Sequence, residues 1–145
     1  MSPFRFYDSN ILLYATSTDP SEAGKQVLAR TLLADDDWGL SAQVLSEFYV
    51  NVTRAKKSQT AALTPAQARE FVSGLLQNRQ CQGISGEMIV EATALATRYQ
   101  IQFWDAVILI AAMQLGCGVV LSEDMSHGQH YGSVQVINPF LNLSH

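Results

Sequence analysis

Short apolar runs with strand character alternate along this chain with longer segments that repeat apolar residues every three or four positions. The short runs suit buried strands, whereas each longer segment presents one apolar face of a helix. Parallel strands need long crossover connections, which helices supply, so this alternation favours strands and helices packed in layers. It predicts a three-layer α/β/α fold with a mainly parallel central sheet, formed by residues 1–145 as a single domain.

The expected elements begin and end at recognisable signals. Thr64, Pro65 and Gln67 give the clearest helix start, because threonine caps a helix, proline fits its first position and glutamine completes a capping box. Gly116 ends the most apolar helical segment. We expect strands at residues 4–7, 38–40, near 84, at 119–121 and at 134–137. We expect helices over residues 10–15, after the caps Ser21, Ser41, Thr64 and Ser85, and over residues 103–115.

Composition excludes several classes of protein. The chain has 145 residues, of which 48% are hydrophobic and only 15% charged, so it is too apolar for a disordered or acidic tail. Nine lysines and arginines against thirteen aspartates and glutamates give a net charge of −4. This charge excludes a non-specific coat for nucleic acid. Such a chain can still act on RNA if a metal ion supplies positive charge inside the site.

The sequence favours a reduced, cytoplasmic protein. Cys81 and Cys117 are too far apart for a zinc knuckle or a thioredoxin-like pair, and we expect both to be ordinary core residues. The N-terminal residues lack the basic and apolar regions of a signal peptide. Residues 103–121 form the most apolar stretch, but Asp105 and Gln114 interrupt it. A buried helix followed by a buried strand therefore explains this stretch better than a membrane span.

Two acidic residues follow predicted strands. Asp8 ends the first strand, and Asp124 comes shortly after the strand at 119–121. In open parallel sheets, ligands bind beyond the carboxyl ends of the strands, so both positions are candidate site residues. Each position also has an ordinary explanation or a competitor. Asp8 can simply cap the next helix, and the sequence alone does not separate Asp124 from its neighbour Glu123.

Two further acidic residues lie on predicted helices beside apolar faces. Glu47 has no basic residue three or four positions later, so a local helical ion pair does not explain it. Asp105 lies in an apolar segment, where a carboxylate is either favoured by the dipole of the first helical turn or costly to desolvate. The ordinary alternatives are a surface glutamate and a helix-stabilising aspartate.

All four acidic residues can meet at one edge of a parallel sheet, beside the carboxyl ends of the strands. Like charges in one cleft repel, so such a cluster needs a divalent cation. Ligands that are all oxygen atoms favour Mg²⁺ or Mn²⁺. We therefore expect a metal site formed by Asp8, Glu47, Asp105 and Asp124.

Four segments of the chain resemble the successive motifs of PIN domains. They are YDSNILLY at residues 7–14, SAQVLSEF at 41–48, FWDA at 103–106 and LSED at 121–124. Their order and spacing are similar to those of VapC-like ribonuclease toxins of bacterial type II toxin–antitoxin pairs. The likeness continues to residues 138–140 and so covers nearly the whole chain.

The resemblance implies roles for particular residues. The quartet Asp8, Glu47, Asp105 and Asp124 corresponds to the acidic quartet of the family. Ser9 and Asn10 are the usual polar companions of the first acid, and Glu123 is a possible helper beside the variable fourth position.

The resemblance also implies an activity and partners. It implies an endoribonuclease that depends on Mg²⁺ or Mn²⁺ and hydrolyses RNA through a metal-activated water molecule, leaving a 5′-phosphate and a 3′-hydroxyl. It further implies a cognate antitoxin that blocks the cleft with a helix, and a homodimer formed through apolar helix surface.

Two alternatives stay open. A phospho-accepting receiver-like module also combines an acidic cluster with Mg²⁺, but it needs a lysine after a late strand, and the chain has none beyond Lys57. A catalytically silent PIN-like scaffold would only bind a partner, and the intact quartet argues against it.

The remaining candidates have ordinary explanations. We expect the run at residues 35–37 to be a solvated loop and the pair His127 and His130 to lie on the surface. We expect core packing for Tyr7, Tyr14, Tyr49, Phe103 and Trp104. For the basic cluster Arg54, Lys56 and Lys57, a helix C-terminal charge pattern and a contact with backbone phosphates are equally good explanations.

Overall fold

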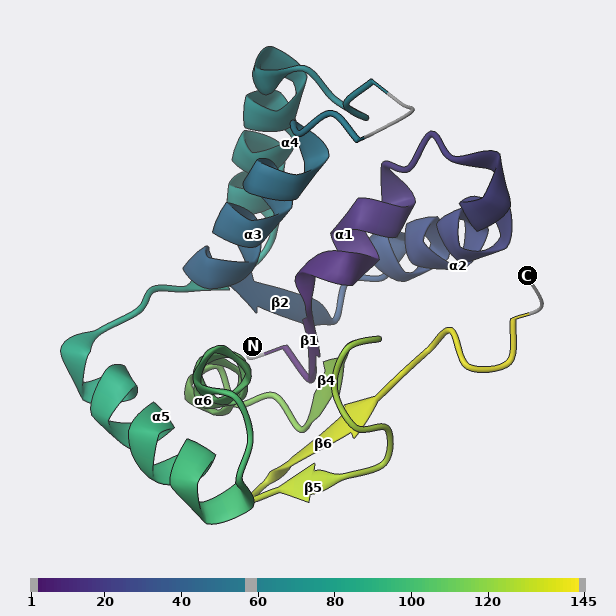
Figure 1. The fold of residues 1–145 in the computed structure, drawn as a ribbon. Helices are drawn as coiled ribbons and strands as arrows, with labels where there is room; N and C mark the ends of the chain where they lie inside the picture. Colours follow the sequence, from purple (N-terminus) through teal and green to yellow (C-terminus); the bar gives the residue numbers. More distant parts are fainter. Residues whose placement is uncertain (1–2, 57–59, 144–145) are drawn as a thin grey trace.

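A six-stranded sheet forms the centre of the computed structural model, which describes residues 3–56 and 60–143 (Figure 1). The strands lie in the order β3-β2-β1-β4-β6-β5, and neighbouring strands are parallel except for β5 with β6. Their bounds are β1 (Arg5–Tyr7), β2 (Trp38–Ser41), β3 (Cys81–Gln82), β4 (Val119–Leu121), β5 (His130–Tyr131) and β6 (Val134–Ile137). The predicted mainly parallel sheet is confirmed.

Helices cover both faces of this sheet, which confirms the three-layer α/β/α fold (Figure 1). On one face lie α5 (Gly86–Tyr99) and α6 (Phe103–Gln114). On the other lie α1 (Ser9–Ala15), α2 (Ala23–Ala34), α3 (Ala42–Val52) and α4 (Pro65–Asn78), with a short 3-10 helix, η1 (Pro20–Glu22), before α2. Helix α6 packs against β2, β3, β4 and β6, so its middle is buried on all sides.

Burial of α6 explains the most apolar stretch of the sequence. Residues 106–112 of this helix are all buried inside the protein. Across the described ranges, no helix combines the length and the apolar character needed to cross a membrane. Cys117 is buried beside the end of α6 and Cys81 is half-buried in β3, and both are free, as predicted.

The chain reverses its direction of travel across the sheet between β1 and β4. It begins at β1, moves outward to β2 and β3, and then returns to β4 on the other side of β1. In open α/β sheets, the crevice at such a switch point is where ligands bind. Tyr7 pairs with Leu121, and the backbone N–H of Asp8 donates to the Leu121 carbonyl at 3.0 Å. Asp8 and Ser122 therefore lie side by side at the start of this crevice.

Most predicted helix starts are confirmed by their caps. The Ser41 and Ser85 hydroxyls accept hydrogen bonds from backbone N–H groups three residues later, and Thr64 forms a complete capping box with Gln67. The predicted cap at Ser21 is wrong. The Asp19 carboxylate accepts from the Ser21 N–H at 2.9 Å and starts η1, because an aspartate before a proline is a better helix start than the serine inside that turn.

The predicted strand near Ile84 is also misplaced. Strand β3 lies at Cys81–Gln82, where its residues pair with Leu40 and Ser41, while Ile84 is exposed in the following loop. A strand of two residues has no sequence pattern of its own, so its position is determined by its pairing with β2. Strand β5 was not predicted for the same reason. Two apolar side chains on helices, Val27 on α2 and Leu76 on α4, are exposed.

Gly39 permits the close approach of β2 to its surroundings. A Cβ atom at this position would lie 3.0 Å from the Gln80 carbonyl oxygen and 3.0 Å from side-chain atoms of Leu115 and Pro3. Real Cβ atoms seldom come so near to other atoms. The neighbouring Leu40 N–H donates to the same Gln80 carbonyl at 3.1 Å, so this carbonyl is fixed in place.

We expect Gly39→Ala to lower the free energy of unfolding by about 1–3 kcal/mol, because the added methyl group overpacks a fixed backbone contact. Chemical denaturation measures this change. The matched control is Gly74→Ala in α4, where a Cβ would meet nothing within 4 Å. It should raise the stability by about 0.5–1 kcal/mol, because alanine is the better helix former. Wild-type stability of Gly39→Ala would contradict the close packing of β2.

Candidate active site

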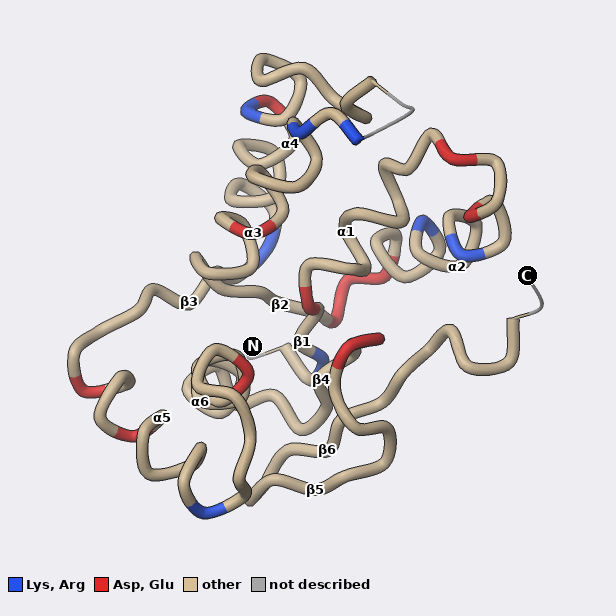
Figure 2. Tube along the Cα trace, in the orientation of Figure 1, with Lys and Arg blue, Asp and Glu red and all other residues tan. Residues whose placement is uncertain are grey.

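The four predicted acidic residues line one cleft at the switch point of the sheet. Asp8 directly follows β1, and Asp124 lies in the loop after β4, while Glu47 is on α3 and Asp105 in the first turn of α6. Figure 2 shows acidic positions before α1, on α3 and α6, and after β4. The cleft has a volume of about 520 Å³, and its other lining residues are Gln43, Ser46, Ile84, Gln102, Trp104 and Ile108.

Asp8 is the most deeply buried of these carboxylates, with only 6% of the residue exposed. Its Oδ1 accepts from the Ser9 N–H at 2.7 Å, and its Oδ2 accepts from the Ser122 hydroxyl at 2.7 Å. Burial raises the pKa of Asp8 from 3.8 to about 6 against the effect of these hydrogen bonds, and the charges of Glu47 and Asp124 raise it further. Asp8 is therefore both the cap of α1 and an acid of the cleft.

Asp105 is held differently. Its carboxylate lies in the first turn of α6, where it accepts no hydrogen bond from a described residue and forms no ion pair with one. Burial raises its pKa, with smaller contributions from the charges of Asp124 and Glu47. For both aspartates burial has a larger effect on the pKa than the like charges, which agrees with the desolvation cost expected for Asp105.

Gln43 fixes the position of Glu47 and was missed by the sequence analysis. Its Nε2 donates to Glu47 Oε1 at 2.8 Å and to the Trp104 carbonyl at 3.2 Å, so it joins α3 to α6. Its own Oε1 is buried without a partner among the described residues and can accept a hydrogen bond from a bound molecule. The only signal in the sequence was its spacing, four residues before Glu47 on the same helix face.

The expectation that Trp104 packs in the core is wrong. The residue is 58% exposed and lies at the cleft, and its ring meets the Phe103 ring edge to face at 5.1 Å. Helix α6 begins at Phe103, and this first turn extends beyond the part of the helix that the sheet and α5 bury. Trp104 therefore offers an aromatic surface beside the acidic residues.

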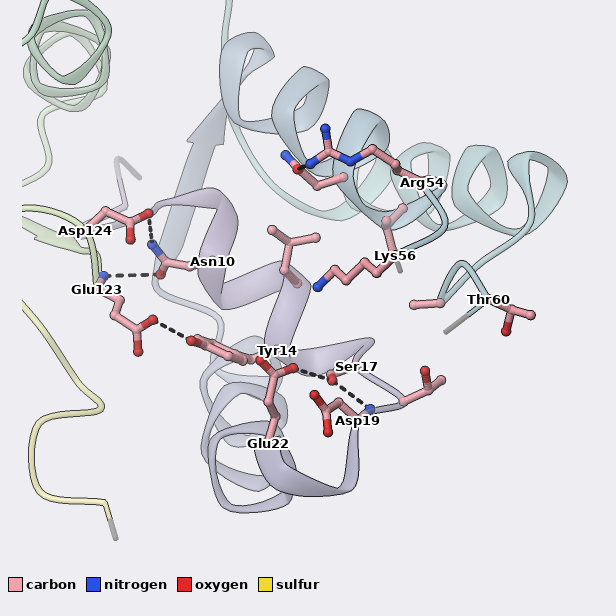
Figure 3. A pocket seen from close by; sticks show the side chains of 15 residues that line it. Asn10, Tyr14, Ser17, Asp19, Glu22, Arg54, Lys56, Thr60, Glu123 and Asp124 are labelled. Carbon is pink, nitrogen blue, oxygen red and sulfur yellow. Dashed lines mark hydrogen bonds between the residues drawn. The ribbon is translucent and has the colours of Figure 1, made fainter. Parts of the chain in front are cut away.

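The structure separates Asp124 from Glu123. Glu123 Oε2 pairs with Lys25 Nζ at 2.7 Å, and its Oε1 accepts a short hydrogen bond from the Tyr14 hydroxyl (Figure 3). Asp124 instead lines the cleft, where its Oδ2 accepts from Asn10 Nδ2 at 3.3 Å. The charge of Glu123 is engaged in an ion pair outside the cleft, so Asp124 is the fourth acid of the cleft.

The other acidic and histidine candidates lie away from the cleft. Asp35 pairs with Arg5 at 2.9 Å, and Asp37 accepts from the Phe4 N–H at 2.7 Å, so the acidic run anchors the start of β1, at the opposite end from Asp8. His127 Nδ1 accepts from the Asn138 N–H at 3.0 Å, and His130 lies exposed in β5.

The tyrosine expectations are met in part. Tyr7 is fully buried and stacks on Trp38 with ring centroids 4.5 Å apart, and Tyr14 is part of the Glu123 network. Tyr49, however, is 40% exposed.

The residues that line the cleft suit a hard divalent cation. Its ionisable groups are all carboxylates, which are the ligands that such ions prefer. No lysine or arginine of the described residues lines the cleft, and burial together with the neighbouring carboxylates raises the pKa of both Asp8 and Asp105. As they stand in the described part of the chain, no three acidic, histidine or cysteine side chains converge on one point. A bound ion would therefore draw the carboxylates closer together.

Comparison with known proteins gives the family. The PIN domain model matches residues 5–130 of this chain. The chain belongs to the PIN domain family. No curated protein matches its sequence.

This PIN domain is similar in fold to several solved structures. A chain of FitAB bound to an IR36 DNA fragment has 20% identity and a TM-score of 0.68, with 97% of this chain and 98% of that one covered. A toxin–antitoxin complex from Klebsiella pneumoniae has 16% identity and a TM-score of 0.64, with coverage of 93% and 97%. VapC20 of Mycobacterium tuberculosis, a sarcin–ricin loop cleaving toxin, has 16% identity and a TM-score of 0.62, with coverage of 83% and 91%.

We expect the stability of this PIN domain in EDTA to fall as the pH rises through the pKa of Asp8. The pKa of Asp8 is about 6 in the folded state and about 3.9 in the unfolded state, so the folded state binds the proton more tightly. This stabilisation is complete below about pH 4 and is lost by about pH 7, a difference of roughly 2–3 kcal/mol. Asp8→Asn, which stays uncharged, should show a smaller loss, because only the raised pKa of Asp105 still contributes.

Urea unfolding over this pH range measures the difference between wild type and variant. Asp36→Asn is the control, because Asp36 is fully exposed and 3.9 Å from its nearest basic partner, Arg79. It should keep the wild-type pH dependence. An equal fall in stability for wild type and Asp8→Asn would mean that Asp8 is not the titrating group.

Proposed function

We propose that this PIN domain is an endoribonuclease that hydrolyses RNA phosphodiester bonds with Mg²⁺ or Mn²⁺. The proposal rests on one observation: four carboxylates with no basic partner among the described residues line a single cleft at the switch point of the sheet. Membership of the PIN family and the likeness to VapC20, a toxin that cleaves the sarcin–ricin loop, support it. The metal ligands would be Asp8, Glu47, Asp105 and Asp124.

The residues of the cleft would divide the work. Asp8 and Asp105 would hold the ion directly, because their raised pKa values give them the most to gain from a positive charge. Glu47, held by Gln43, and Asp124, held by Asn10, would bind it directly or through water, or accept a proton from the attacking water. When bound, the ion lowers the pKa of a water molecule and offsets the charge on the leaving oxygen.

Trp104 is the candidate for contacts with the nucleotides beside the cleaved bond. The exposed face of Trp104 can stack on a base, an interaction worth about 1–3 kcal/mol that tolerates any sequence. Water is the nucleophile in this proposal, so the 2′-hydroxyl of RNA does not attack. The products are a 5′-phosphate and a 3′-hydroxyl.

We expect Asp8→Asn, Asp105→Asn and Asp124→Asn each to lower RNA cleavage with Mn²⁺ by at least about 100-fold, because each removes a metal ligand. Glu123→Gln and Asp36→Asn are the controls and should keep most of the activity, since neither side chain lines the cleft. The measurement is cleavage of a labelled RNA, with EDTA as a second control and circular dichroism as a check on folding. Full activity in Asp8→Asn or Asp105→Asn would refute the assigned site.

The same assay decides between the proposal and its alternatives. A wild-type protein that folds but cleaves no RNA with Mg²⁺ or Mn²⁺ would be a silent scaffold. A receiver-like module is disfavoured, because the chain is a PIN domain and no lysine lines the cleft in the described ranges.

We infer that the protein acts as a toxin with a cognate antitoxin and forms a homodimer. The compared structures include toxin–antitoxin complexes, which supports the antitoxin. A cleft of unpaired carboxylates suits an arginine presented by such a partner, because the guanidinium group matches a carboxylate in shape and charge. For the dimer, α3 and α4 share a groove whose apolar rim includes the exposed Tyr49, Val50 and Leu76.

We expect light scattering to give twice the mass of one chain for the wild type. Val50→Glu with Leu76→Glu should give a single chain, because two charges in the groove oppose the burial of its apolar surface. The control is Val27→Glu, an exposed valine on α2 that lies outside the groove. It should stay dimeric. A monomeric wild type at high concentration would remove the homodimer from the proposal.

A further inference from the structure

A second pocket adjoins the carboxylate cleft and shares Asp124 with it (Figure 3). It has a volume of about 320 Å³ and lies between α1, the segment around η1, and the end of α3. Asp124 and Asn10 lie at one end of this pocket, and Arg54 and Lys56 lie at the other. An RNA strand that leaves the cleft beside Asp124 and follows this pocket would therefore reach Arg54 and Lys56 at its far end.

The acidic residues of this pocket are already engaged. Glu123 pairs with Lys25 at 2.7 Å, and Glu22 accepts from the Ser17 hydroxyl at 2.6 Å. The Asp19 carboxylate accepts from the Ser21 N–H and caps η1. The charge of Glu123 is paired, whereas the Glu22 carboxylate accepts from a neutral hydroxyl group. Glu22 and Asp19 lie at the η1 end of the pocket (Figure 3).

The basic residues are not engaged in the same way. The ion pairs of the described residues involve Arg5, Lys25 and Arg79, so neither Arg54 nor Lys56 has a carboxylate partner there. Among the described residues, the Arg54 side chain donates to the neutral Asn51 side chain, at 2.6 Å. Both residues are exposed, and the Lys56 ammonium group points into the pocket towards α1 (Figure 3).

The position of these residues weakens their ordinary explanation. Basic residues stabilise a helix when they lie in its last turn. Helix α3 ends at Val52 and has no basic residue in its last turn, so Arg54 and Lys56 come after the helix. Lys57, the third residue of the basic cluster, lies outside the described residues.

We propose that this pocket binds a backbone phosphate of the RNA strand whose scissile phosphate lies in the carboxylate cleft. Arg54 and Lys56 are the residues that contact this phosphate. A chain of net charge −4 repels RNA, and four of its carboxylates gather in the cleft, so basic residues beside the cleft would offset this repulsion where the strand lies. Such residues position the strand and carry no sequence information. The inference rests on the proposed ribonuclease function.

The test is the binding of a fluorescent single-stranded RNA to the protein in EDTA, measured by anisotropy over a range of salt concentrations. Arg54→Ala with Lys56→Ala should weaken binding at low salt by at least about tenfold. The slope of log Kd against log salt should fall by about 0.7 for each phosphate that the variant no longer neutralises. Lys56→Arg should bind like the wild type, because it keeps the charge.

The matched control is Arg30→Ala with Arg98→Ala, which removes the same charge from exposed residues that line neither the cleft, this pocket nor the α3–α4 groove. It should leave the slope unchanged. Equal effects in the two double variants, or no effect in the first, would overturn the proposal. Loss of antitoxin binding with unchanged RNA binding would also overturn it, because the pocket would then be a protein-binding surface.

Cleavage by the wild type with Mn²⁺ separates the two proposals. Cleavage together with unchanged RNA binding in Arg54→Ala with Lys56→Ala refutes the phosphate pocket alone. A wild type that does not cleave RNA refutes the proposed function itself.

Discussion

The parallel pairing of β1 with β4 is the contact on which the candidate site depends. It joins segments more than a hundred residues apart and places Asp8 beside Ser122 at the point where the strand order reverses. The Ser122 hydroxyl donates to Asp8 and accepts from the Asp124 N–H at 3.2 Å. Without this register, the acidic residues of the cleft would not meet, although the helices that carry two of them would still form.

Some acidic residues outside the cleft have a basic partner, whereas those inside it have none among the described residues. Asp35 and Glu123, which lie outside the cleft, pair with Arg5 and Lys25. Inside the cleft the hydrogen-bond partners are neutral: hydroxyl, amide and backbone N–H groups. Neutral donors fix the direction of a carboxylate but leave its charge in place. The carboxylates of the cleft therefore keep a negative charge that no lysine or arginine of the described residues balances.

Much of the site could be predicted because it follows from local rules. Asp8 and Asp124 were visible because they follow strands, and Glu47 and Asp105 because they interrupt apolar helix faces. The choice between Glu123 and Asp124 could not be made, since Lys25, which decides it, is 98 residues away in sequence. Trp104 was misjudged because burial depends on which helix turn the sheet covers. The strands β3 and β5 are too short to carry a pattern of their own.

The double hydrogen bond of Gln43 has a mechanical consequence. One amide group holds the Glu47 side chain on α3 and the first-turn backbone of α6, two helices on opposite faces of the sheet. A displacement of α6 relative to α3 would therefore disturb the amide group that orients Glu47. The position of Glu47 in the cleft is thus tied to the packing of α3 against the first turn of α6.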